Sequence, residues 1–310
     1  MKLKNKKIFI TGGAGYLGSN LVRRFYDENE ITVYSRDEAK HYYLKKQFPK
    51  IRCVIGDVRD YDNMKKSSEG HDIGIFTASL KQIGAVDQNV NESVKIIIDG
   101  ALNSRRIAEE HNFESACFIS TDKSRSATTL YGAMKFVAGE SFIVNSDVTK
   151  TKLSTALYGN VTNSTGSIIP LIWDSIRRKY ELTLFSKEMT RFIIDIEDAM
   201  DLVEVALNYD GYNVIPKIKS IRISDLFELY EEEFGLCYNH GVPRISEKLH
   251  EIMISAEEVP RTSVDNNHYF MHYKDVCEGV SFSNNEYSSK DCVMSKEELK
   301  DMLKKNNWYE

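Results

Sequence analysis

The amino-acid sequence predicts an α/β protein with a doubly wound parallel sheet, and two observations support this class. In the first half of the 310-residue chain, short β-branched runs alternate with amphipathic stretches, which is typical of a parallel sheet with helices on both faces. The first run also leads directly through a glycine-rich turn into a helical pattern. We therefore expect a Rossmann-type sheet, followed by a smaller, discontinuous C-terminal substrate domain.

The first half is expected to hold six strands with helices between them. The strands are predicted at Lys7–Thr11, Ile31–Ser35, Ile51–Ile55, Ile73–Thr77, Ala116–Ser120 and Leu153–Tyr158. Helical spacing is clearest in two apolar sets, which are Leu17, Leu21, Val22 and Phe25, and Val94, Ile97, Ile98 and Ala101.

The second half is less regular, and one short strand is expected to rejoin the main sheet at Asn213–Ile215. Four helices are predicted at Ser167–Lys179, Ile196–Leu207, Ser224–Phe234 and Ser295–Leu303. Ser224 is the expected N-cap of the third, and Ser295 with Glu298 matches a capping box in the fourth. We expect a cofactor domain over 1–160 with a returning segment near 190–216, and a mainly substrate-binding domain over 161–310.

Composition excludes several classes of protein. The net charge of -5 argues against a nucleic-acid binder, because phosphate neutralisation needs a basic excess. The five cysteines form no CxxC pair and no His cluster has metal-ligand spacing, so we expect reduced thiols, no metal and a cytoplasmic protein. The apolar run after the basic N-terminus is too short for a signal peptide, and no stretch approaches the roughly 20 apolar residues of a membrane span.

The glycine-rich turn indicates a dinucleotide site. Gly12, Gly15 and Gly18 stand between a strand and a helix at the start of a βαβ unit. Glycines there allow a tight turn and let backbone amides approach a pyrophosphate on the helix N-terminus. A purely structural turn is the competing interpretation.

The end of the second strand favours NADP. Ser35 and Arg36 stand where an arginine pairs with the 2′-phosphate of NADP. Asp37 argues against NADP, because an acidic residue at this position favours NAD, although Asp37 could simply cap the next helix. After the third strand, Asp57 can accept a hydrogen bond from the adenine amino group.

Tyr131 and Lys135 indicate redox chemistry. They are four residues apart and therefore share one face of a helix. A lysine ammonium beside a phenol is expected to lower the tyrosine pKa from ~10 towards neutrality. The tyrosine could then remove a hydroxyl proton while hydride leaves the same carbon for a nicotinamide.

Nine motifs occur along the chain in the order seen in one family. They are TGGAGYLG, YSRDE, GDVRD, LKQ, STDKS, LYGAMK, YGN, MTRF and EKLHE. In these segments, from about Lys4 to about Glu258, the chain resembles the inverting UDP-N-acetylglucosamine 4,6-dehydratases. These are extended short-chain dehydrogenase/reductase enzymes that also invert carbon 5. The Thr-Asp-Lys triplet is the most specific match, since retaining dehydratases carry Asp-Glu there and simple epimerases carry neither pair.

The resemblance implies a catalytic set of Thr121, Asp122, Lys123, Tyr131 and Lys135. Oxidation at carbon 4 makes the carbon 5 proton acidic. Lys123, if neutral, is the expected base for it, and Asp122, if protonated, donates to the departing carbon 6 hydroxyl. Thr121 would hydrogen-bond the carbon 4 oxygen. A surface ion pair is the competing interpretation of Asp122 and Lys123.

The resemblance also implies binding residues and partners. The cofactor set comprises Gly12, Gly15, Tyr16, Leu17, Gly18, Ser35, Arg36, Asp57, Val58, Ala78, Ser79, Lys81, Tyr131 and Lys135. The substrate set for a UDP-sugar comprises Lys81, Asn160, Ser167, Thr190 and Arg191, with Arg244 and Glu251 as weaker candidates. The family forms homo-oligomers, so a dimer or hexamer is expected.

Four positions depart from the family pattern. Phe76 replaces a usual histidine, Ile97 an asparagine and Leu157 an arginine, and Ser246 replaces the glycine of a Gly-Glu-Lys. Phe76 and Ile97 are expected near the cofactor. The alternatives left open are a nucleotide-sugar 4-epimerase or 4-reductase, which need only Tyr131 and Lys135, and an NADP-binding protein without activity.

Overall fold

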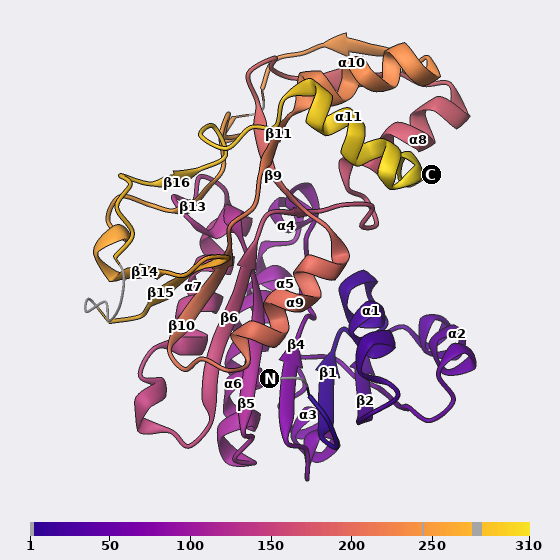
Figure 1. The fold of residues 1–310 in the computed structure, drawn as a ribbon. Coiled ribbons are helices and arrows are strands. Elements are labelled where there is room, and N and C mark those ends of the chain that lie inside the picture. The colour runs from indigo at the N-terminus through magenta and orange to yellow at the C-terminus, as the bar shows by residue number, and fades with distance from the viewer. Residues whose placement is uncertain (1–2, 244, 275–280) are drawn as a thin grey trace.

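A central β-sheet organises the molecule (Figure 1). The computed structural model describes residues 3–243, 245–274 and 281–310. Among these residues the main sheet has nine strands in the order β14-β15-β10-β6-β5-β4-β1-β2-β3. Their bounds are β1 Lys7–Thr11, β2 Glu30–Ser35, β3 Arg52–Ile55, β4 Ile73–Phe76, β5 Ser115–Thr121, β6 Lys152–Tyr158, β10 Tyr212–Pro216, β14 Thr262–Val264 and β15 His268–His272.

Seven neighbouring strands of this sheet pair in parallel, and in sheet order they are β3, β2, β1, β4, β5, β6 and β10. The six strands predicted in the first half are confirmed to within a residue at each end, and β10 rejoins the sheet beside β6, as expected. Strands such as β1 and β4 could be predicted from sequence because helices cover both faces of the sheet, which leaves nearly continuous runs of buried apolar residues. The antiparallel edge formed by β15 and β14 was not predicted.

Helices cover both faces of the sheet. Their bounds are α1 Tyr16–Phe25, α2 Glu38–Gln47, α3 Tyr61–Ser68, α4 Ile83–Gln88, α5 Val90–Val94, α6 Gly100–Glu110, α7 Leu130–Ile143 and α9 Ile196–Ala206. Leu21 of α1 and Met200 of α9 share one core, while Met64 of α3 and Phe142 of α7 belong to the core on the other face. This confirms the doubly wound arrangement.

The second apolar set lies on a helix that is not regular. A π-helical turn, Lys95–Asp99, joins α5 to α6, whereas the spacing of Val94, Ile97, Ile98 and Ala101 predicted an uninterrupted helix. The extra residue in the turn leaves Ile96 and Ile97 buried and Ile98 only partly so. Such turns frequently occur at functional sites, and Ile96 does reach the cavity described below.

A smaller unit lies beyond the carboxyl ends of the strands (Figure 1). Its helices are α8 Ile168–Arg178, α10 Ile223–Phe234 and α11 Lys296–Lys305. Its short strands are β7 Asn160–Val161, β8 Leu182–Leu184, β9 Thr190–Ile194, β11 Ser220–Arg222, β12 Tyr238–His240, β13 Ile252–Ile254 and β16 Tyr287–Ser288. Trp173, Phe227 and Leu303 belong to the core that the three helices share. Because β9 lies here and β10 in the main sheet, the chain crosses between the two units; the domain bounds themselves stay a prediction.

Two predicted caps have different outcomes. Ser295 and Glu298 form the expected capping box at the start of α11. Ser224 is not an N-cap, because α10 begins one residue earlier, after Arg222. Its hydroxyl instead donates to the carbonyl of Lys187 at 3.0 Å, so a contact distant in sequence takes the side chain away from the helix end.

Candidate active site

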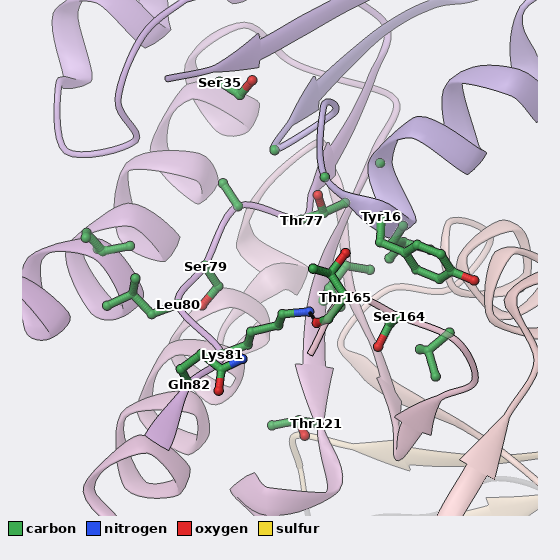
Figure 2. Close-up of a pocket in the computed structure, with 18 of the residues that line it drawn as sticks. Tyr16, Ser35, Thr77, Ser79, Leu80, Lys81, Gln82, Thr121, Ser164 and Thr165 are labelled. Carbon is green, nitrogen blue, oxygen red and sulfur yellow. Dashed lines mark hydrogen bonds between the residues drawn. The ribbon is translucent and has the colours of Figure 1, made fainter. Parts of the chain in front are cut away.

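A cavity of about 1000 Å³ opens at the carboxyl ends of the parallel strands. This is where ligands bind in open α/β sheets. It runs from the turn after β1, past the ends of β2 and β4, to the loop after β6 (Figure 2). All fourteen residues predicted to bind the cofactor line it, as do Thr121, Lys123, Asn160 and Ser167. The structure therefore brings these predicted residues together around one space.

The glycine turn forms a cradle that side chains would fill. Gly12 has a φ of +67°, and a Cβ there would lie 2.8 Å from the amide nitrogen of Ala78. A Cβ on Gly18 would lie 2.5 Å from the Cα of Gly13 and would also strike the carbonyl oxygen of Gly12. No side chain caps the N-terminus of α1, so its first amides remain available to an anion. These residues fit a dinucleotide.

The end of β2 presents a hydroxyl, two cations and the Asp37 carboxylate to the cavity. Ser35 is held by His41, with 2.5 Å between Oγ and Nε2. Arg36 and Lys40 both line the cavity, and Lys40 was not predicted, although a second cation four residues after Arg36 was a usable signal. Asp37 caps α2 by accepting from the Lys40 amide at 3.0 Å.

Asp57 is less free than expected. Its carboxylate accepts hydrogen bonds from Arg59 Nε at 2.9 Å and Nη2 at 2.7 Å, and lies 3.7 Å from Arg36. Burial would raise the pKa of Asp57, but Arg59 outweighs it and lowers the pKa. The residue lines the cavity as an ion-paired carboxylate, so an adenine amino group would compete with Arg59 for it.

The loops after β4 and β7 close the other end of the cavity. The Lys81 ammonium donates to the carbonyl of Thr165, which joins the two loops (Figure 2). Burial lowers the pKa of Lys81. The hydroxyls of Ser79 and Ser167 are buried without a hydrogen-bond partner in the described chain. Ser167 also precedes α8, whose N-terminus no side chain caps. This end of the cavity thus offers one cation and free donors.

The Thr-Asp-Lys triplet lies where β5 ends. Asp122 is fully buried and does not line the cavity, whereas Lys123 does. Lys123 Nζ lies 3.1 Å from Asp122 Oδ1 and 3.3 Å from Asn160 Oδ1, and Thr121 donates to Asp122 Oδ1 at 3.0 Å. A carboxylate with no exposure is not part of a surface ion pair, so that competing interpretation is wrong.

The charges around Lys123 differ from the neutral base that was expected. Burial would lower the pKa of Lys123, but the adjacent carboxylates of Asp122 and Glu251 outweigh it and raise the pKa. Burial raises the pKa of Asp122, with Glu251 adding to the rise. Lys123 therefore rests as an ammonium, and Asp122 is a carboxyl that takes up a proton readily.

Tyr131 and Lys135 share the buried face of α7, but they are not paired as expected. Lys135 Nζ donates to the carbonyl of Ile119 at 2.6 Å. Burial raises the pKa of Tyr131 to about 12, against the opposing charge of Lys123, and burial lowers the pKa of Lys135 to about 7. The prediction that Lys135 lowers the tyrosine pKa is wrong for this structure, because both groups are desolvated and Lys123 is the cation that acts on the phenol.

Two predicted substrate residues lie outside the cavity. Thr190 Oγ1 contacts His250 Nδ1 at 2.8 Å and Ser289 Oγ at 2.7 Å. The Arg191 guanidinium donates to the carbonyls of Thr190 and Leu249 and to Glu247. Neither lines the cavity, because contacts with residues about sixty positions later hold both side chains. Arg244 lies outside the described residues.

Three of the four positions that depart from the family pattern are core residues, whereas the fourth, Ser246, is exposed. Phe76, Ile97 and Leu157 are all buried, and none lines the cavity. The expectation that Phe76 and Ile97 lie against the cofactor is therefore not met: both belong to the core beneath α7. Among lining residues that were not predicted, Gln82 and Tyr158 lie within the LKQ and YGN motifs, and membership of those motifs was the available signal.

The sheet, the glycine turn under α1 and the Tyr-x-x-x-Lys of α7 define an extended short-chain dehydrogenase/reductase. The chain belongs to the polysaccharide biosynthesis protein family, whose model matches residues 8–273. In the described residues no helix is long and apolar enough to cross a membrane.

Three relatives align with most of the chain. An uncharacterized membrane protein of Methanocaldococcus jannaschii is 34% identical over 97% of this chain and 96% of its own length. The inverting UDP-N-acetylglucosamine 4,6-dehydratase of Campylobacter jejuni is 33% identical, covering 85% of this chain and 82% of its own. A UDP-glucose 4-epimerase of Rickettsia massiliae is 30% identical, with 86% and 82% covered. The resemblance to the family of inverting dehydratases is confirmed.

A solved structure shares the whole fold. Pen from Bacillus thuringiensis is 26% identical, covers 99% of each chain and superposes with a TM-score of 0.90. The C-terminal unit is therefore common to both proteins, and not only the dinucleotide-binding half.

Proposed function

We propose that this protein is a UDP-N-acetylglucosamine 4,6-dehydratase that inverts carbon 5 and works with bound NADP. The observation that supports this most is the Asp122–Lys123 pair. Lys123 lines the cavity beside Tyr131, and its Nζ lies 3.1 Å from Oδ1 of the buried Asp122 behind it. The sequence likeness to an inverting dehydratase supports this choice of reaction. A 4-epimerase or 4-reductase needs no such pair.

The cofactor preference for NADP rests on the end of β2. Ser35, Arg36 and Lys40 offer a hydroxyl and two cations to a 2′-phosphate. Asp37, the residue that would favour NAD, is engaged at the start of α2 and lies 3.3 Å from Lys40 Nζ. A bound nicotinamide supplies a hydride acceptor and donor, so the hydride from carbon 4 is stored and returned at carbon 6.

The protein's own residues handle the protons. Tyr131 takes the proton of the carbon 4 hydroxyl in its phenolate form, which the Lys123 ammonium favours against burial, and Thr121 hydrogen-bonds the oxygen. Lys123 must first lose a proton, and Asp122 Oδ1 is the acceptor within reach at 3.1 Å. That single transfer yields a neutral amine and a protonated carboxyl together. The amine then removes the carbon 5 proton. Asp122 does not line the cavity, so its proton passes to the carbon 6 hydroxyl through Thr121, which lines the cavity and contacts Asp122 Oδ1 at 3.0 Å, and the hydroxyl leaves as water. A proton from solvent then reaches carbon 5 from the other face and inverts it.

The substrate assignment rests on the far end of the cavity. Lys81, Ser167 and the free N-terminus of α8 suit a diphosphate. Arg191 could join them only after leaving Glu247, which lies 3.3 Å from it. We propose a UDP-sugar, with UDP-N-acetylglucosamine favoured by the named relative.

One experiment tests the reaction. The purified protein is incubated with UDP-N-acetylglucosamine in deuterated water, and carbon 5 is followed by NMR. We expect a 4-keto-6-deoxy product with deuterium at carbon 5 and inverted configuration. Retained configuration would contradict the inverting assignment. Epimerisation at carbon 4 without loss of water would favour the epimerase.

A homo-oligomer is also proposed. The packed helices α6 and α7 carry exposed apolar side chains, including Leu102 at 44% and Val137 at 43% exposure. Two copies meeting on this face would cover them. We expect light scattering to report a dimer or a multiple of it, and Leu102→Glu with Val137→Glu to shift the protein towards monomers. A monomeric wild type would contradict the proposal.

A further inference from the structure

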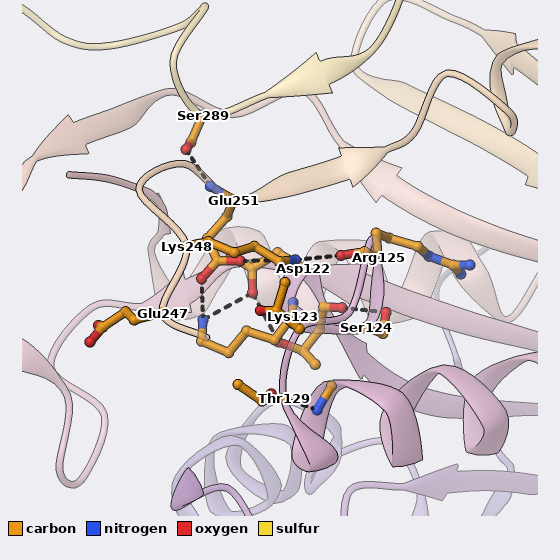
Figure 3. A network of polar contacts seen from close by, with 12 residues as sticks. Asp122, Lys123, Ser124, Arg125, Thr129, Glu247, Lys248, Glu251 and Ser289 are labelled. Atoms are coloured by element: carbon orange, nitrogen blue, oxygen red, sulfur yellow. Dashed lines mark hydrogen bonds and ion pairs between the residues drawn. The ribbon is translucent and has the colours of Figure 1, made fainter. Parts of the chain in front are cut away.

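Glu251 is a buried carboxylate with no assigned role in the reaction above. It is 4% exposed and directly precedes β13. Its amide donates to Ser289 Oγ at 2.9 Å (Figure 3), and its carbonyl accepts from the Ser289 amide at 2.8 Å. Both contacts fix its backbone, so the side chain is aimed at the catalytic triplet by a segment 38 residues further along.

Its carboxylate faces three cations without being tied to any one. Oε1 lies 3.6 Å from Lys123 Nζ and 3.7 Å from Arg191 Nε, and Oε2 lies 3.7 Å from Lys248 Nζ. Oε2 has no hydrogen-bond partner among the described residues. At these distances the interactions are mainly electrostatic, and they are strong because the groups are buried. Glu251 therefore acts on Lys123 as a fixed negative charge.

Other ionisable groups also face this pair. Asp122, Tyr131, Arg191 and Lys248 all act on Lys123 or Asp122. Glu247 contacts Arg191 at 3.3 Å and shows no contact with Lys123. His250 contacts Thr190. Within the described part of the chain, Asp122 and Glu251 are the two residues whose carboxylates lie within 4 Å of Lys123 Nζ.

We propose that Glu251 is a positioning residue for the Asp122–Lys123 pair, whose charge sets the pH range over which that pair holds one shared proton. The inference rests on the proposed dehydratase function. The one-proton form is the active one, because it alone can convert to the neutral amine and protonated carboxyl. Below that range both groups are protonated and no base exists. Above it neither carries a proton and no acid exists.

The sign of the effect follows from the charge. A nearby negative charge favours proton uptake, so Glu251 raises the pKa of both Asp122 and Lys123. The two groups titrate as a coupled pair with two apparent pKa values. Removing the negative charge of Glu251 lowers both pKa values, so the whole bell-shaped pH profile moves towards lower pH.

The test is the pH profile of carbon 5 deuterium exchange. Glu251→Gln is expected to move both limbs of kcat to lower pH by roughly one unit, and Glu251→Asp to restore most of the wild-type position. Lys248→Met removes a cation from the same carboxylate and should move the profile the other way. Glu233→Gln is the control, because its carboxylate pairs with Lys300 on α11, away from the cavity, and it should leave the profile in place.

Several outcomes would overturn the inference. One is a Glu251→Gln profile that coincides with wild type. Another is a folded, NADP-binding Glu251→Gln without exchange at any pH, which would assign Glu251 a direct catalytic role. If Glu251→Gln does not fold, an unshifted Lys248→Met profile contradicts the inference instead. A wild type that releases no water from the substrate refutes the proposed function and is thus a distinguishable result.

Discussion

At the scale of single residues, the site depends on how buried charges share protons. Asp122 has no exposed surface, and its Oδ2 lacks a hydrogen-bond partner within the described chain. A buried charge is tolerated when a partner compensates it, and Lys123 is that partner at 3.1 Å. The pair is therefore stable as ions and needs only one short proton transfer to become an acid and a base.

Lys123→Ala is the substitution that best separates the candidate reactions. We expect it to reduce water release by roughly 10²–10⁴-fold, the usual contribution of a positioned acid or base. NADP binding should persist, because the glycine turn is untouched. Product formation by NMR measures the first effect and a fluorescence titration the second.

The control for Lys123→Ala is Lys300→Ala. Lys300 lies on α11 and pairs with Glu233, away from the cavity, and its loss should leave turnover near the wild-type rate. If Lys123→Ala keeps full activity on a nucleotide sugar, the enzyme is an epimerase or reductase and the dehydratase proposal fails.

The sequence predicted the cavity's lining better than the network behind it. Gly12, Ser35 and Tyr131 follow strands or open helices, and the topology alone carries such positions to one edge of the sheet. Glu251 and Arg191 depend on contacts between segments about sixty residues apart. No local spacing encodes those contacts, so the direction of the Arg191 side chain could not be predicted.

At the scale of elements, the junction of β1 and α1 decides cofactor binding. Gly18 lies on the first turn of α1 against the backbone of Gly12 and Gly13. A side chain there must push the helix away from the turn, since backbone atoms cannot move aside as a flexible side chain can. The amides at the helix N-terminus would then no longer converge on one pyrophosphate.

Gly18→Ala is therefore expected to weaken NADP binding at least 10-fold, equivalent to about 1.4 kcal/mol, measured by calorimetric titration. Gly84→Ala is the matched control, because a Cβ on Gly84 meets nothing within 4 Å. It should leave the affinity unchanged. Equal affinities for wild type and Gly18→Ala would contradict the assigned role of the turn.

Elements were predictable where their pattern was local. β1 and α9 were found almost to the residue because their apolar periodicity is strong. The π-helical turn at Lys95–Asp99 was missed, since one inserted residue barely alters the spacing of apolar side chains. β14 and β15 were missed because their antiparallel pairing joins a tail of mixed polarity to a distant strand, β10.

At the scale of the whole molecule, a buried ion cluster joins the catalytic loop to the C-terminal part of the chain. Arg125 lies two residues after the triplet and is 1% exposed. It donates to Glu258 at 2.7 Å and to Glu140 of α7 at 2.8 Å, and Arg261 contacts both carboxylates. The helix that carries Tyr131 and the loop that carries Lys123 are therefore held by one set of charges.

Arg125→Met should destabilise the protein by about 3–5 kcal/mol, the usual cost of leaving buried charges without a partner. Chemical denaturation measures the loss. Lys4→Met is a suitable control, because it breaks the exposed pair of Lys4 with Glu28 and should change stability by no more than about 1 kcal/mol. Similar losses in both variants would show that the cluster does not hold the molecule together.

The same cluster predicts how stability depends on acidity. Burial would raise the pKa of Glu140, but Arg125 and Arg261 outweigh it and lower the pKa below its ordinary 4.5. A carboxylate whose pKa is lower in the folded protein contributes stability above its unfolded pKa and loses that stability as the pH falls through the folded pKa.

Glu140→Gln tests this dependence. The variant keeps an oxygen that can accept the hydrogen bond of Asn213 Nδ2, which lies 3.0 Å from Oε1 in the wild type, but it carries no charge. The stability difference between wild type and Glu140→Gln should therefore stay constant from neutral pH down to about 5 and shrink steadily below that. Urea denaturation at a series of pH values measures it, and a difference that grows on acidification would show that Glu140 is not held as an ion by the two arginines.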